Sequence, residues 1–146
     1  MAMQEEEKKE GTLAPEGWSA AHERFDALGP TARTVVREVA TAMEFDREEY
    51  DERVTSEVVE TARRTLFAER LRVRVADAAA FEAWRRDAEV AVHVVGHDQV
   101  DRVAWHVAPA ADSAVAATFQ SEPAAAVATV RRMAFNRLYR EELCDP

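Results

Sequence analysis

The chain has 146 residues, of which 28 are acidic and 19 basic, with a formal net charge of −9, 47% hydrophobic residues and one cysteine. This length fits one domain with one hydrophobic core, and the hydrophobic content excludes a wholly disordered chain. A single cysteine excludes an internal disulfide framework and a cysteine metal cluster.

The basic residues are biased, because only Lys8 and Lys9 are lysines and the other seventeen are arginines. A GC-rich genome accounts for that bias by itself. Together with the acidic excess, it is also typical of proteins from salt-loaded cytoplasms, where molar salt shortens the Debye length to about 3 Å and screens self-repulsion. We therefore expect a halophilic protein.

Residues 1–11 form a charged segment that ends at Gly11. It is too polar to offset the entropy of ordering, so we expect a disordered, solvated tail. The segment lacks the apolar stretch of a signal peptide, and no apolar run reaches the roughly 18 residues of a membrane-spanning helix. These features favour a cytoplasmic protein that does not contact a membrane.

Residues 12–146 are predicted to form one α+β domain, helical from 15 to 70 and sheet-containing from 71 to 143. Four helices are expected in the helical part. The first ends at Gly29, and the second begins at Pro30, which suits a first helical position. The second helix has one apolar stripe at helical spacing: Ala32, Val35, Val36, Val39, Ala40 and Met43.

The third and fourth helices are marked by capping residues. Asp46 and Glu49 have the spacing of a capping box for a short helix over 47–53. Thr55 can cap the fourth helix through its hydroxyl group.

The hydrophobic period changes from helical to alternating at Leu71, which indicates a strand over 71–75. Asp77 can cap a helix that carries Phe81 and Trp84. Strands are expected over 90–95, 102–108 and 114–120, and a long final helix from Pro123. The pattern predicts four N-terminal helices packed on a β-α-β-β-β-α, four-stranded, mostly antiparallel sheet.

Alternation within these strands predicts which side chains share a face of the sheet. A turn at 97–100 pairs the second and third strands and places Trp105 on an apolar face, beneath helices that carry Phe81, Trp84, Val130 and Ala134. The opposite face is then basic, provided that Leu71, Val73 and Val75 point to the apolar one. Its residues are Arg72, Arg74, His93, Arg102 and His106.

A basic face on an acidic chain is a candidate site for an anionic ligand or an acidic partner. Guanidinium groups bind carboxylates and phosphates in bidentate fashion, and histidines can titrate near neutrality. Two alternatives stay open: these are ordinary solvent-side strand residues, or the N-terminal helices cover them with acidic partners.

The register of the last hairpin bears on that choice. A five-residue turn over 109–113 pairs Val107 with Val115 and keeps the basic face polar. A four-residue turn puts Val115 and Phe119 on the histidine side, so that the sheet is buried on both faces.

We expect neither a metal site nor a cofactor. Histidine and aspartate residues cluster around one hairpin without a converging set of three or four ligands; they are His93, His97, Asp98, Asp101 and His106. With four glycines in the chain there is no phosphate-cradling loop, and neither a nucleophile elbow nor an HExxH motif occurs. No catalytic residue is predicted.

Residues 78–143 follow the α-β-β-β-α order of a double-stranded-RNA-binding domain. That family has a lysine-rich patch at the start of its last helix, where this chain has Ser121, Glu122 and Pro123. Phosphate contacts also weaken steeply with salt. The sequence therefore favours RNA binding less than protein interaction or the binding of a small anion.

Four stretches resemble a small uncharacterised haloarchaeal protein family, a domain of unknown function, over about Gly11 to Glu141. They are GPTARTVVREVATAMEFDREEYDERVTSEVVETAR (29–63), FEAWRRD (81–87), DRVAWHVAP (101–109) and AATFQ (116–120). The resemblance implies a halophilic source and brings no activity or site residue.

The sequence favours a non-enzymatic interaction or regulatory module that binds a protein partner or a second copy of itself. The first alternative is a small anionic-ligand-binding protein or enzyme that uses the Arg/His face. The second is a module that binds double-stranded RNA.

Overall fold

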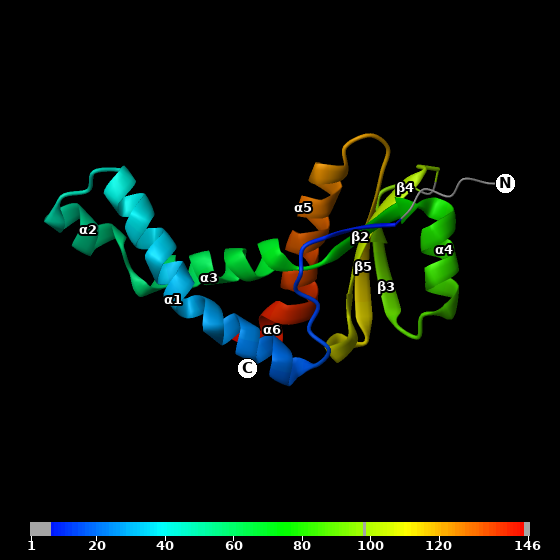
Figure 1. The fold of residues 1–146 in the computed structure, drawn as a ribbon, viewed down its shortest axis with the longest axis horizontal. Helices are drawn as coiled ribbons and strands as arrows, with labels where there is room; N and C mark the ends of the chain where they lie inside the picture. The colour runs from blue at the N-terminus through cyan, green and yellow to red at the C-terminus, as the bar shows by residue number, and fades with distance from the viewer. Residues whose placement is uncertain (1–6, 98, 145–146) are drawn as a thin grey trace.

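The computed structural model describes residues 7–97 and 99–144. The fold is α+β, as predicted, with a sheet that has helices on both faces (Figure 1). The N-terminal helices α1 (Trp18–Ala42), α2 (Arg47–Arg53) and α3 (Ser56–Arg70) extend away from the sheet. We call residues 30–60, the outer part of this extension, the arm. None of the described helices combines the length and hydropathy needed to cross a bilayer.

Helix α1 is continuous, so the predicted break at Gly29 and Pro30 is wrong. Proline inside a helix costs about 3 kcal/mol, because it removes a backbone hydrogen bond and its ring meets the carbonyl four residues earlier. The buried side of α1 nevertheless runs across the proline and includes Phe25, Leu28, Ala32, Val36 and Ala40. Packing outweighs local propensity, and residues 7–70 form three helices rather than the predicted four.

The predicted helix caps are confirmed. The Asp46 carboxylate accepts a hydrogen bond from the Glu49 backbone N–H at 2.8 Å, and the Thr55 hydroxyl accepts one from Val58 N–H at 3.3 Å. Asp77 caps helix α4 (Ala78–Asp87) through Ala80 N–H at 2.7 Å.

Within the described residues the sheet has five strands, not four: β1 (Lys8–Glu10), β2 (Val73–Asp77), β3 (Ala91–Val95), β4 (Arg102–Ala108) and β5 (Ser113–Phe119). Their order across the sheet is β1-β2-β4-β5-β3. Strand β3 pairs in parallel with β5, while the other three pairings are antiparallel. The sheet is therefore mixed.

The predicted hairpin between residues 90–95 and 102–108 is wrong, because β3 lies at the sheet edge beside β5. Helix α4 explains the difference. It connects β2 to β3 as a crossover and packs Phe81 against Trp105, with ring centroids 5.2 Å apart. The crossover carries β3 past β4 and β5. Strands 91–119 are therefore not a run of neighbouring hairpins, and the topological likeness to a double-stranded-RNA-binding domain fails.

Part of the expected tail is ordered as a strand. Lys8–Glu10 pairs antiparallel with β2, and Glu7 forms an ion pair with Arg74. Gly11 then turns the chain at a φ of +89°, where a side chain would collide with the Leu71 carbonyl oxygen. The prediction of a solvated tail is wrong for residues 8–10, whereas residues 1–6 lie outside the described residues.

Both faces of the sheet are buried. The last hairpin has the four-residue turn, with Ala108 opposite Ser113 and His106 opposite Val115. One face packs under α5 (Pro123–Ala134), which continues through a π-helical turn, η2 (Phe135–Tyr139), into α6 (Arg140–Cys144). The other face packs under α4. Trp105 is fully buried there beside Phe81 and Trp84, as predicted, but the predicted α5 residues Val130 and Ala134 lie in the core on the opposite face.

Candidate functional site

The predicted Arg/His face does not exist as one accessible surface. Strand alternation is correct for Arg102, His93 and His106, which lie on the same side of the sheet. Arg74 lies on the other side, because β2 pairs with β4 so that Arg74 is opposite Trp105. Its guanidinium carbon is 5.0 Å from the centre of the indole ring. The expected orientation of strand 71–75 is therefore inverted.

The remaining residues of that face are separated or covered. His106 is 1% exposed beneath α5, while His93 is exposed on the edge strand β3. The Arg102 guanidinium carbon is 5.5 Å from the centre of the Phe119 ring. Arg72 precedes β2 and reaches His106 only through its backbone carbonyl oxygen. These positions do not form a common binding surface.

His106 is instead the centre of a buried hydrogen-bonded link. Its Nδ1 donates to the Arg72 carbonyl oxygen at 2.7 Å, so Nε2 is the unprotonated nitrogen and accepts from the Tyr139 hydroxyl at 2.7 Å. Burial, with a smaller effect of the Arg131 charge, lowers the pKa of His106 to about 4. Burial also raises the pKa of Tyr139. Both groups are neutral at pH 7 and join β4, the start of β2 and η2.

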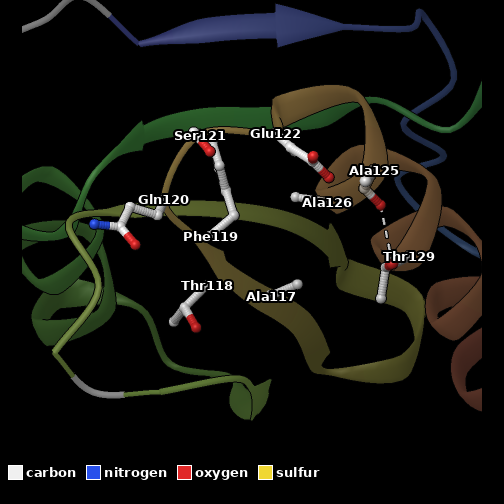
Figure 2. Close-up of a pocket in the computed structure, with 9 residues that line it drawn as sticks. All are labelled: Ala117, Thr118, Phe119, Gln120, Ser121, Glu122, Ala125, Ala126 and Thr129. Carbon is white, nitrogen blue, oxygen red and sulfur yellow. Dashed lines mark hydrogen bonds between the residues drawn. The ribbon is translucent and has the colours of Figure 1, made fainter.

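The hollow in Figure 2 lies between the end of β5 and the start of α5 and has a volume of about 360 Å³. Small and polar side chains line it, and Glu122 is its charged residue. The Thr129 hydroxyl donates to the Ala125 carbonyl oxygen at 2.9 Å. The described lining of the hollow contains no cation to hold an anionic ligand.

Among residues 7–97 and 99–144, no three His, Cys, Asp or Glu side chains converge as metal ligands. The histidine and aspartate group around residues 93–106 is dispersed by the separation of β3 from β4. Asp98, which belongs to that group, lies outside the described residues.

The arm has the feature that best indicates a function. In the described part of the chain, four large apolar side chains are exposed, and all four lie on the arm: Val35 (39%), Val39 (51%), Met43 (58%) and Val58 (43%). Val35, Val39 and Met43 are spaced four residues apart, so they form one row along α1. We call these three residues the arm row.

The sequence contained this row but did not distinguish it from the core. The apolar stripe predicted for the second helix includes both the arm row and the buried residues Ala32, Val36 and Ala40. Six apolar positions in twelve residues are an ordinary density for a helix with one buried face, so the spacing alone does not show which of them stay exposed.

No curated protein and no solved structure gives a significant match to this chain. A family model matches residues 12–140, which is most of the chain and includes the arm, strands β2 to β5 and α5. The chain belongs to that family, a family of unknown function (DUF5809).

Proposed function

We propose that the protein is a non-enzymatic interaction module that pairs with a second copy of itself through the arm row. The observation that carries this proposal is the placement of every exposed large apolar side chain of the described residues on the arm. Exposed apolar groups that gather on one element are typical of protein interfaces. Figure 1 shows that the arm extends clear of the sheet, which leaves it accessible to a second molecule.

The spacing of the arm row favours a second copy as the occupant. Val35 and Met43 lie four residues before and after Val39, so the row is symmetric about Val39. If two α1 helices cross in opposite directions on a twofold axis at Val39, Val35 of each copy meets Met43 of the other. A twofold interface requires this reciprocal contact between the same surface patches.

Charge makes pairing through the arm dependent on salt, because residues 30–60 contain nine acidic and four basic side chains. Each chain has a net charge of −9, so two copies repel each other wherever large surfaces approach. Contact between two protruding arms keeps the bodies apart. Added salt screens the remaining repulsion, and pairing is expected to strengthen with potassium chloride.

Sedimentation velocity tests the proposal with the purified chain in molar potassium chloride. We expect the wild type to dimerise at about 100 μM, where an association free energy of about −5.5 kcal/mol gives half occupancy. Val39→Asp should be monomeric, because it places two carboxylates on the twofold axis. The control is Thr41→Asp, an exposed position on α1 with the same charge change, rotated by about 200° from Val39.

Thr41→Asp should leave the dimer intact. A wild type that is monomeric at this concentration contradicts the proposal. Equal dissociation of both variants also contradicts it, since a general charge effect would then explain the result.

We also infer that the protein works in a salt-loaded, halophilic cytoplasm. The support is compositional: an acidic excess of nine charges combined with two lysines. Low lysine content and high negative charge suit a surface that is stable only when counter-ions screen it.

A further inference from the structure

A groove between α3 and the α5–η2 helix concentrates positive charge on an otherwise acidic protein. It has a volume of about 330 Å³, at the small end of the range for ligand pockets. Four arginines line it against one acidic residue. Its charged and amide-bearing residues are Arg64, Glu69, Arg131, Arg132, Asn136 and Arg140.

The arginine charges of this groove are largely uncompensated within the described residues. There, Arg131, Arg132 and Arg140 have no carboxylate within 4.0 Å, whereas Arg63 and Arg74 elsewhere form ion pairs. Groups of guanidinium ions repel each other, so a cluster without carboxylate partners is costly unless an anion joins it.

Arg64 gives a second, independent indication. Its Nε lies 3.8 Å from a Glu60 carboxylate oxygen, too far for a hydrogen bond. That nitrogen is buried and has no hydrogen-bond acceptor in the described structure. A buried N–H group without an acceptor lowers stability, and an acceptor brought by a ligand would remove that cost.

The π-helical turn η2 brings Arg140 to the groove. The Arg140 N–H bonds to the Phe135 carbonyl oxygen five residues earlier, which stacks Arg140 over Phe135. In a regular α-helix, five residues correspond to a rotation of about 500°, which would turn Arg140 by about 140° from Phe135. Single π-turns inside α-helices are frequent at functional sites.

Arg131, which lines the groove, is held in place by a backbone carbonyl. Its Nε donates to the Leu71 carbonyl oxygen at 3.1 Å, which fixes the guanidinium plane beside the C-terminal end of α3. A fixed plane loses little entropy when its remaining N–H groups bind a ligand. Arg64 on α3 and Arg131 on α5 thus provide donors from opposite walls.

We propose that this groove binds the diphosphate group of a small phosphorylated ligand. Guanidinium groups match phosphate oxygens in bidentate geometry, and donors on two walls fit two linked phosphoryl groups better than one. A diphosphate also has the charge to balance the excess of arginine. The ligand is small because the volume of the groove is small.

Titration calorimetry with inorganic pyrophosphate and with ADP tests the proposal, in the lowest potassium chloride concentration at which circular dichroism shows the folded protein. We expect saturable binding of one ligand per chain. Tighter binding of ADP would identify a nucleotide, and equal affinity would identify the diphosphate group alone. Equal affinity for inorganic sulfate would overturn the phosphate assignment.

The decisive variant is Arg132→Gln with Arg140→Gln, two exposed positions whose removal leaves the buried contacts intact. We expect at least about tenfold weaker binding, which corresponds to about 1.4 kcal/mol. The matched control is Arg85→Gln with Arg86→Gln, exposed on α4 with the same charge change. The control should stay within about twofold of the wild type, a range expected of surface charges far from a site.

Arginine Nε–H resonances in ¹⁵N NMR locate the ligand. Pyrophosphate should move the Arg64 and Arg131 signals and leave Arg85 unchanged. Equal loss of affinity in both double variants, or no binding by the wild type, would overturn the proposal.

Discussion

Acid destabilisation through His106 is the prediction that follows most directly from the buried hydrogen-bonded link. His106 has an ordinary pKa of 6.5 when unfolded and a pKa of about 4 in the fold. The unfolded chain therefore binds a proton in this interval that the folded chain does not. The contribution of neutral His106 to the free energy of unfolding is complete above pH 6.5 and is lost as the pH falls to about 4.

The magnitude follows from the separation of the two pKa values. At about 1.4 kcal/mol per pH unit, acidification from 6.5 to 4 should cost about 3 kcal/mol. The physical cause is that a protonated Nε2 cannot accept the hydrogen bond from the Tyr139 hydroxyl. Protonation also places a charge in the core. Urea denaturation at a series of pH values in constant potassium chloride measures this loss.

Substitution separates the His106 contribution from that of the carboxylates, which also titrate toward pH 4. His106→Gln keeps a donor and an acceptor but removes the titrating imidazole. Between pH 6.5 and 4, its free energy of unfolding should therefore fall by about 3 kcal/mol less than that of the wild type. His93→Gln, which removes an exposed histidine on the same side of the sheet, should retain the wild-type dependence. If His106→Gln does not fold, the His106 ring resonance in the wild type gives the pKa directly.

The reasoning is refuted if the wild type and His106→Gln lose stability in parallel between pH 6.5 and 4. A His106 ring resonance that titrates near pH 6.5 in the folded protein refutes it as well.

Three further outcomes are expected. Trp105→Ala should lower the free energy of unfolding by about 3–5 kcal/mol, as for other large buried aromatic side chains, and a loss below about 1 kcal/mol would contradict its place under α4. Deletion of residues 1–10 should cost about 1–2 kcal/mol, because β1 and its hydrogen bonds to β2 are lost, and an unchanged thermal midpoint would show that β1 adds nothing. Chemical denaturation midpoints should rise from low to molar potassium chloride, and equal midpoints would contradict the halophilic interpretation.

Features that depend on neighbouring residues were predictable from the sequence. Asp46, Thr55 and Asp77 form the expected caps because each hydrogen bond joins residues three apart. Strand β4 has the predicted bounds, and Trp105 and His106 lie on opposite faces because alternation is a property of a single strand.

Features that depend on distant segments were not predictable. The placement of β3 beside β5 is decided by the crossover of α4, and the orientation of Arg74 by the pairing of β2 with β4. The prediction of a common Arg/His face was wrong because it depended on the placement of β3 and on the orientation of Arg74. Helix α1 continues through Pro30 because packing with α3 compensates, a contact that local propensity does not contain.

The exposure of the arm row also could not be predicted from neighbouring residues in the sequence. Val35 and Val36 are adjacent and chemically identical, yet Val36 is buried and Val35 is exposed. Their difference depends on where α3 lies against α1. The arginine groove likewise depends on α3 and α5, which are far apart in sequence.

Cross-linking at the proposed twofold axis tests the central claim most directly. In a Cys144→Ser background, Val39→Cys should form a disulfide-linked dimer under mild oxidation, because a residue on the axis meets its own copy within the roughly 3.5–4.5 Å between Cβ atoms that a disulfide allows. Thr41→Cys in the same background should form no disulfide-linked dimer. Absence of the Val39→Cys dimer, or equally fast cross-linking of Thr41→Cys, would contradict pairing through the arm row.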